Sequence, residues 1–152
     1  MQKTDTQLAA ELKRKGHTAF SWCELDVTTL PTGVLTQHFK VGDPTQSQSP
    51  TVFKVYFPPN TYVEAHTRDC DYTEILIEGT QKVGATWHKA GDIRVGLANR
   101  GYGPLVAGPE GCTVMFVFAD GRWPALTLGK NDGSTLGSEV IVAHHEKLNQ
   151  SA

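Results

Sequence analysis

The sequence predicts an all-β protein in which several short strands close into a sandwich or a barrel. Short apolar runs recur along most of the chain, at the spacing of about 8–12 residues that is typical of such folds. Turn-forming sequences separate the runs, and 15 glycines and 8 prolines supply the corners. The predicted strands cover residues 34–41, 51–57, 62–67, 74–77, 81–83, 93–97, 105–107 and 112–118.

The 152 residues fit one domain with a single core and an extension at each end. Residues 4–15 are predicted to form a short amphipathic helix, because Thr4 and Gln7 match a capping box and Gly16 suits its end. We assign residues 1–18 to this helical extension, 19–125 to the β-barrel, and 126–152 to a C-terminal extension packing on the barrel or a dimer partner. Residues 140–147 are predicted to form a last strand or a short helix.

Composition excludes several classes of partner. The net charge of −2 leaves no basic excess for a phosphate backbone, so we expect no nucleic-acid partner. No apolar run approaches the length of about 18 residues that a transmembrane helix needs, so we expect no membrane association. The first residues lack the apolar segment of a secretory signal, which predicts a cytoplasmic location. Three cysteines without paired spacing predict reduced thiols.

Two motifs in the middle of the chain resemble those of the cupin superfamily. The family's first motif is a glycine, five residues, His-x-His, three or four residues, a glutamate, six residues and a glycine. Here Asn60 takes the place of the first glycine, His66 matches the first histidine, Arg68 replaces the second, and Gly79 closes the motif. Asn tolerates a positive φ better than most residues, so the substitution at 60 is mild.

The second motif begins with Gly91-Asp92, and its ligand histidine position, eleven residues after the glycine, is Tyr102. The resemblance implies a double-stranded β-helix, that is, a cupin jelly-roll barrel with its site inside, of the small single-domain RmlC-like kind. Counting back from the closing glycine puts the family's glutamate at Tyr72, and Glu74 lies two residues later. Either Glu74 or a residue of the loop 69–72 would complete the site.

Strand alternation places Tyr62, Glu64, His66 and Arg68 on one face. Metal ligation calls for about three His, Asp or Glu side chains, and around the matched positions only His66 and Glu74 are suitable. Further candidates for a rebuilt site are His38, His88, Asp69, Cys70, Asp71, His144 and His145. A guanidinium cannot ligate a metal, so Arg68 points to a weakened or rebuilt site. At most we expect one divalent transition metal: Fe, Mn, Ni or Zn.

Without a metal, His66 is a candidate catalytic base and Tyr102 a candidate catalytic acid. Arg68 would bind the carboxylate or phosphate of an acidic substrate, and Glu74 would pair with Arg68 or orient His66. The prediction is therefore a small-molecule-binding cupin, and whether it is an enzyme stays open. The alternatives are a metal-dependent oxygenase, isomerase or lyase, a metal-free isomerase or epimerase, and a non-catalytic sensing module. A homodimer is expected, because an exposed sheet edge needs cover.

Overall fold

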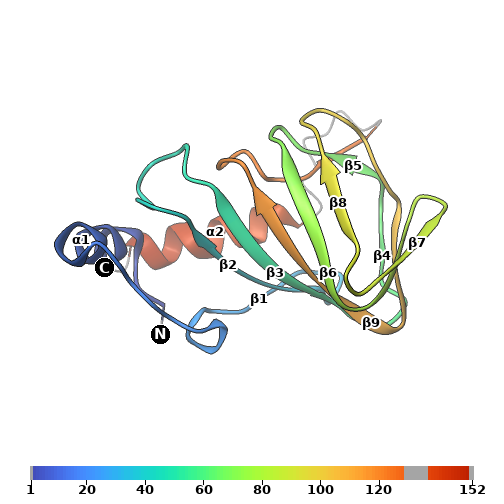
Figure 1. Ribbon diagram of the computed structural model, residues 1–152, viewed down its shortest axis with the longest axis horizontal. Helices are drawn as coiled ribbons and strands as arrows, with labels where there is room; N and C mark the ends of the chain where they lie inside the picture. Colours follow the sequence, from blue (N-terminus) through green and yellow to red (C-terminus); the bar gives the residue numbers. More distant parts are fainter. Residues whose placement is uncertain (1, 129–136, 151–152) are drawn as a thin grey trace.

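The computed structural model describes residues 2–128 and 137–150, and its centre is a bent antiparallel sheet (Figure 1). Two long strands, β6 (Tyr72–Val83) and β9 (Leu105–Phe118), run side by side and bend, so that each contributes to two faces of a barrel. The strand order is β1-β2-β3-β9-β6-β7, with β8 paired to β6 and β4 to β9, and β5 pairs with β10 in a second small sheet. The shorter strands are β1 (Thr28–Thr29), β2 (Leu35–Lys40), β3 (Thr51–Phe57), β4 (Tyr62–Val63), β5 (His66–Thr67), β7 (Thr86–Lys89), β8 (Ile93–Gly96) and β10 (Leu126–Thr127).

The all-β prediction is confirmed, with one helix near each end of the described chain. Helix α1 (Asp5–Lys15) has the predicted cap: the Gln7 amide donates to the Thr4 hydroxyl at 3.2 Å, and the Thr4 amide donates to the Gln7 side chain at 2.9 Å. Gly16 ends the helix at φ 77°. A 3-10 turn, η1 (Trp22–Glu24), leads into the sheet.

The second helix, α2 (Ser138–Gln150), decides between the two alternatives for residues 140–147 in favour of a helix. Its Ile141 belongs to the barrel core. Its far end contacts α1, because Asp5 accepts a hydrogen bond from His145 at 2.8 Å and its amide donates to Asn149 at 2.9 Å. No helix within residues 2–128 and 137–150 is both long and apolar enough to cross a membrane.

The two long strands correct the predicted breaks within them. Residues 74–77 and 81–83 belong to one strand, because Glu78 and Gly79 pair with β9 between two register shifts and do not form a turn. Gly79 has φ 80°, and a Cβ there would stand 2.1 Å from the Gly111 carbonyl oxygen of β9. Only glycine allows the two strands to cross so closely. Residues 105–107 and 112–118 are likewise joined in β9, whereas predicted strand 62–67 is divided into β4 and β5.

Asn60, the residue in place of the motif glycine, has the positive φ of 61° that the substitution predicts.

The core lies inside the bend, on the faces that strand alternation turns inward. The inward side chains are large and mostly aromatic or branched. They are Val34, Phe53, Val55, Phe57, Cys70, Tyr72, Leu76, Ala107, Cys112, Val114, Phe116, Phe118, Trp123 and Ile141.

Candidate functional site

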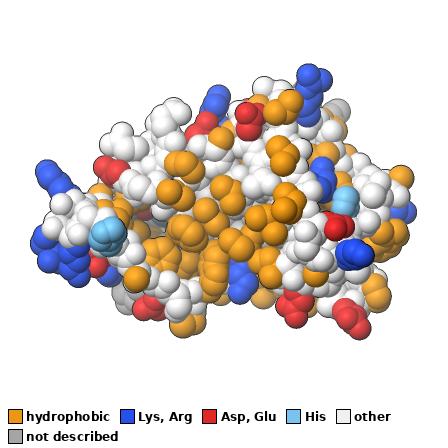
Figure 2. Space-filling model, viewed as in Figure 1, with side chains coloured by type: hydrophobic (Ala, Val, Ile, Leu, Met, Phe, Trp, Pro, Cys, Tyr) orange, Lys and Arg blue, Asp and Glu red, His pale blue; other side chains and the backbone are white. Residues whose placement is uncertain are grey.

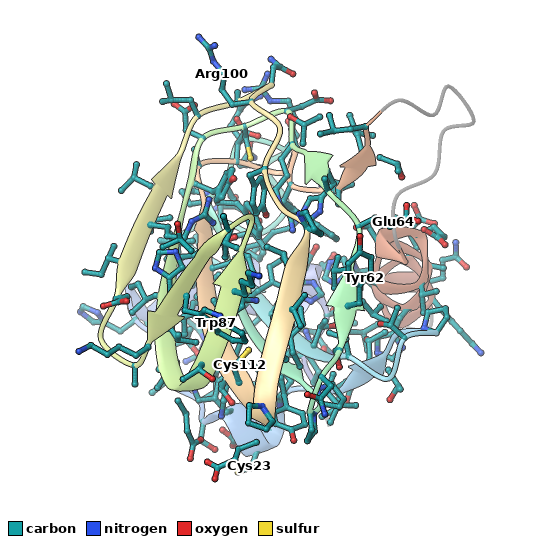
Figure 3. The ribbon with its side chains drawn as sticks, turned by 90° about the vertical axis from the view of Figure 1, so that its right-hand side faces the viewer. Cys23, Tyr62, Glu64, Trp87, Arg100 and Cys112 are labelled. Atoms are coloured by element: carbon teal, nitrogen blue, oxygen red, sulfur yellow. The ribbon has the colours of Figure 1, made fainter. Side chains whose placement is uncertain are left out.

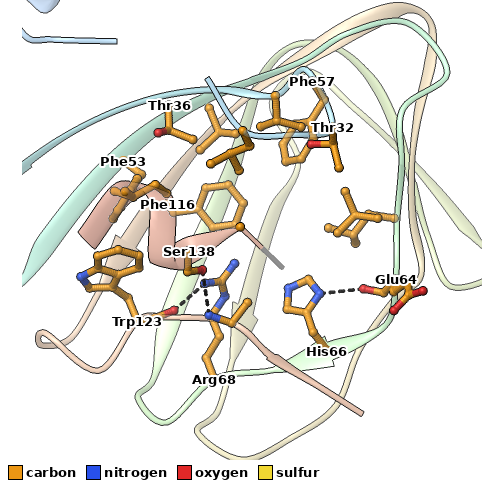
Figure 4. Close-up of a pocket in the computed structure, with 18 of the residues that line it drawn as sticks. Thr32, Thr36, Phe53, Phe57, Glu64, His66, Arg68, Phe116, Trp123 and Ser138 are labelled. Atoms are coloured by element: carbon orange, nitrogen blue, oxygen red, sulfur yellow. Dashed lines mark hydrogen bonds between the residues drawn. The ribbon is translucent and has the colours of Figure 1, made fainter. Parts of the chain in front are cut away.

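A cavity of about 470 Å³ lies inside the barrel (Figure 4). Most of its wall is apolar, and four phenylalanines of β3 and β9 together with Trp123 dominate it. Helix α2 contributes Ser138 and Ile141 to another wall. The Ser138 hydroxyl accepts a hydrogen bond from the Ala125 amide at 3.2 Å, which fixes the start of this helix against the barrel. The cavity is therefore closed by residues from both the barrel and the C-terminal extension.

Residues 62, 64, 66 and 68, which are predicted to share one face, all line this cavity, and Val63 between them lines it as well. Tyr62 is 58% exposed and stands at the mouth, whereas His66 is 1% exposed. Figure 3 labels Tyr62 and Glu64 on the side of the barrel next to α2. The polar groups of the cavity thus come mainly from one continuous segment.

His66 is held at both ring nitrogens. Its Nδ1 lies 2.8 Å from the carbonyl oxygen of Glu64 (Figure 4). A carbonyl only accepts hydrogen bonds, so Nδ1 carries the proton and Nε2 has the free lone pair. That Nε2 accepts the hydroxyl of Tyr102 at 2.9 Å. Burial, assisted by the charge of Arg68, lowers the pKa of His66 to about 4, so the ring is neutral at physiological pH.

Tyr102 reaches His66 because the two backbones pair directly. The amide of each donates to the carbonyl of the other at 3.0 Å, in a single antiparallel bridge. The guanidinium of Arg94 stacks 4.8 Å from the Tyr102 ring centre. Burial raises the pKa of the Tyr102 phenol above its usual range. The described residues that line the cavity do not include Tyr102, which therefore supports His66 from behind.

Among the described residues, Arg68 is the one guanidinium in the cavity wall. Its Nη1 donates to the Trp123 carbonyl at 2.5 Å, and its Nε points to the Tyr102 hydroxyl at 3.4 Å. The group also lies over the Phe118 ring, 4.8 Å from its centre. Within the described part of the chain, no carboxylate lies within ion-pair distance of Arg68. A half-buried cation therefore faces an apolar cavity with donors to spare.

Glu74 is placed differently from the sequence-based expectation. It does point inward from β6, but its partner is Arg94, which lies opposite it on β8. Within the described residues it forms no hydrogen bond with Arg68 or His66, and it does not line the cavity. Its other carboxylate oxygen, Oε1, is buried without a hydrogen-bond partner in the described structure. Glu74 therefore neutralises Arg94 and not Arg68.

Sequence reasoning missed Arg94 and the C-terminal contributors. Arg94 could have been found, because alternation between the apolar Ile93 and Val95 turns it inward. The roles of the Trp123 carbonyl and of Ser138 carried no sequence signal, since both depend on how the chain returns after the barrel is closed. The loop 69–72 supplies no cavity side chain among the described residues.

A divalent metal does not fit this arrangement of residues. Both nitrogens of His66 are engaged, Glu74 is paired with Arg94, and Arg68 would repel a dication in the same cavity. Across residues 2–128 and 137–150, no three His, Cys, Asp or Glu side chains are grouped to hold a metal ion. The predicted ligand pair of His66 and Glu74 is therefore not assembled at the cavity.

Comparison with known proteins identifies the architecture. No family model and no curated protein matches the sequence. An RmlC-like cupin from Ralstonia eutropha JMP134 superimposes with a TM-score of 0.68 at 12% identity, over 93% of this chain and 92% of that one. The polyketide cyclase RemF from Streptomyces resistomycificus gives 0.58 at 13% identity, over 77% and 89%. Oxalate decarboxylase from Bacillus subtilis gives 0.58 at 18% identity, over 87% of this chain and 39% of that one. Identities this low establish a common fold only.

Proposed function

The chain has the cupin fold, and we propose that its barrel binds an apolar small molecule that carries an acidic group. The observation that carries this proposal is the guanidinium of Arg68, which projects into a largely aromatic cavity without a carboxylate partner in the described structure. A charge that is removed from water without a counter-ion is costly, and an anionic ligand offsets that cost.

The rest of the cavity supports a ligand with a ring or a short hydrocarbon chain. A volume of about 470 Å³ suits one molecule of modest size, within the range of known ligand sites. Phe53, Phe116 and Trp123 offer ring faces and edges for apolar contact. A carboxylate accepts two parallel hydrogen bonds from a guanidinium, so the acidic end is expected at Arg68. The neutral His66 adds no competing positive charge.

A thermal-shift experiment with matched pairs of ligands tests the proposal. The probes are benzoate, phenylacetate and hexanoate, each compared with its neutral amide at pH 7.5. At ten times the dissociation constant, a ligand stabilises by about 1.4 kcal/mol, a rise of about 3–5 °C in melting temperature for a domain of this size. We expect the acids to give this rise and the amides not to. Equal shifts for acids and amides would contradict the proposal.

A second candidate function is metal-free acid–base chemistry, and the 2.9 Å contact between His66 and Tyr102 favours it. His66 would take a proton at Nε2 from a carbon beside a carbonyl, and a proton would return to the carbon from the pair. The Tyr102 hydroxyl occupies that lone pair, so the phenol must first give way. For this reason the candidate ranks second.

Proton exchange tests the second candidate directly. Phenylacetate and hexanoate, the two probes that have α-protons, are incubated with the protein in D₂O, and loss of the α-proton signal is followed by NMR. Catalysis by the pair predicts exchange that His66→Gln and Tyr102→Phe both abolish. Binding without exchange leaves a carrier or sensing module. The metal-dependent oxygenase, isomerase or lyase has less support, since the candidate ligands His66 and Glu74 are engaged elsewhere.

A further inference from the structure

One threonine interrupts the apolar part of the cavity wall that β2 and β3 form. Val34, just before β2, and Thr36 within it both line the cavity, and they are 2% and 3% exposed. From β3 the same wall receives Phe53, Val55 and Phe57. Among these five residues, Thr36 alone has a polar side chain. Apolar side chains also cover the centre of the outer face of this sheet (Figure 2), so the threonine is not part of a polar stripe that crosses the sheet.

The hydroxyl of Thr36 is weakly bonded for a buried group. It donates to the Thr28 carbonyl at 3.4 Å, whereas hydroxyl donors usually stand about 2.7–2.8 Å from their acceptor. A hydroxyl has one proton and two lone pairs, so this contact leaves both lone pairs available. Valine would fill the same space without the cost of burying a poorly bonded hydroxyl. The lone pairs of Thr36 therefore point to a ligand group that donates a hydrogen bond.

Thr36 faces Arg68 from the other side of the cavity. Strand β2 belongs to the large sheet, whereas Arg68 directly follows β5 of the small sheet. Figure 4 shows the two side chains on opposite walls. On the large sheet, the ring centre of Phe116 lies 5.6 Å from the guanidinium carbon of Arg68, and Phe53 is its partner on β3, the strand next to β2. A ligand whose acidic group is bound at Arg68 therefore extends over aromatic rings toward Thr36.

We propose that the ligand is a hydroxylated aromatic acid. Its carboxylate binds Arg68, and the hydroxyl at its other end donates to Thr36. Its ring packs between these two points on Phe53 and Phe116. A ligand carbonyl in place of the hydroxyl only accepts, and the one proton of Thr36 is directed at Thr28. An ammonium donates as well, but a buried charge needs more than one neutral oxygen as its partner. This inference rests on the proposed function and narrows its class of ligand.

The hydroxyl should raise affinity by a modest and measurable factor. A hydrogen bond between neutral groups replaces one to water, and its net contribution corresponds to about three- to tenfold in affinity. Thr36→Val keeps the branched shape of the side chain but puts a methyl group where the hydroxyl was. The ligand hydroxyl then loses its partner, so the hydroxylated acid should bind no more tightly than its parent. Thr36→Ser keeps a hydroxyl and should keep the preference.

Isothermal titration with pairs of acids tests the proposal. The pairs are benzoate with 4-hydroxybenzoate and phenylacetate with 4-hydroxyphenylacetate, so that the distance from the acid to the hydroxyl varies. We expect at least one hydroxylated acid to bind the wild-type protein about three- to tenfold more tightly than its parent, and Thr36→Val to remove this gain. 2-Hydroxyphenylacetate, whose hydroxyl stays near the acid, should show no gain that depends on Thr36.

Thr51→Val is the matched control variant. Thr51 is 0% exposed, its hydroxyl has no hydrogen-bond partner in the described structure, and it is not among the described residues that line the cavity. Removing this hydroxyl should therefore leave the gain intact. Circular dichroism shows whether each variant is folded, and Thr36→Ala, which also lacks the hydroxyl, repeats the test if Thr36→Val is not.

Several outcomes would overturn the inference. A wild-type protein that binds neither hydroxylated acid more tightly than its parent does so without any variant. A gain that persists in Thr36→Val, or that Thr51→Val also removes, does so as well. The preference of each parent acid over its amide is measured in the same series. If that preference is present and the gain is absent, this inference alone fails, whereas if no acid is preferred over its amide, the proposed function fails with it.

Discussion

Replacing Arg68 with methionine should separate ligand recognition from folding. Methionine keeps an unbranched apolar stem of similar length but removes the charge, all five donors and the guanidinium that lies over Phe118. The change therefore acts on the acidic end of the ligand and leaves the apolar wall of the cavity almost unchanged.

Two opposing effects set the stability of the variant without ligand. The hydrogen bond from the guanidinium to the Trp123 carbonyl is lost, and bonds to charged groups are worth about 1.5–3 kcal/mol. Relief from holding a half-buried cation without a counter-ion offsets a similar amount. We expect the free energy of unfolding to change by no more than about 1 kcal/mol. Affinity for a carboxylate, in contrast, should fall by about 2–3 kcal/mol, or roughly 30–150-fold, because a charge-assisted pair disappears.

Isothermal titration of a binding acid and its amide into wild-type and variant protein gives both affinities, and urea unfolding gives the stability. Arg100→Met is the matched control, since Arg100 is exposed at the end of the barrel away from the cavity wall (Figure 3). Equal loss of affinity for acid and amide would refute the role of Arg68, because a carboxylate-specific contact cannot weaken a neutral ligand. So would unchanged affinity for the acid.

Three further predictions concern pH, the strand crossing and metal content. Burial is the main cause that lowers the pKa of both His38 and His66 from 6.5 to about 4. Below pH 6.5 the unfolded chain therefore binds protons that the folded protein does not. Stability should be full above pH 6.5 and fall by about 3 kcal/mol per histidine as the pH drops to 4, and His66→Gln should remove about half of this slope in urea titrations at each pH. Gly79→Ala should cost at least about 3 kcal/mol by urea unfolding, whereas Gly42→Ala, with a similar φ of 77° and no atom within 4 Å, should cost about 1 kcal/mol; equal costs would mean that the strand crossing is not tight. Elemental analysis of protein purified without chelators should find less than about a tenth of an equivalent of any transition metal, and a full equivalent would contradict our reading of the ligand set.

The sequence was sufficient for features that depend on local geometry. The helix cap at Thr4 and Gln7, the positive φ at Asn60 and the common facing of His66 and Arg68 all follow from residue type and a two-residue period. The motif spacing also predicted that His66 and Tyr102 lie close together, because the spacing of the motifs within a cupin barrel determines which strand ends are neighbours.

The sequence alone did not predict which side chains pair with one another across neighbouring strands. Glu74 shares the inward face as alternation requires, yet its partner is Arg94, because the register of β6 with β8 sets these two opposite each other. The register shifts on either side of Glu78 and Gly79 likewise allow one bent strand where two strands were predicted. Such a bend depends on the neighbouring strand, because β9 passes so close to Gly79.

Local chain chemistry thus determined the strands, the turns and the inward direction of His66 and Arg68. The closing of the barrel decided which groups those side chains meet: Tyr102 behind the imidazole, the Trp123 carbonyl at the guanidinium, and helix α2 at the cavity wall. The physical reason is the separation along the chain of the residues involved. Side-chain direction repeats every two residues along one strand, whereas a counter-charge or a cavity wall comes from segments that only the folded sheet brings together.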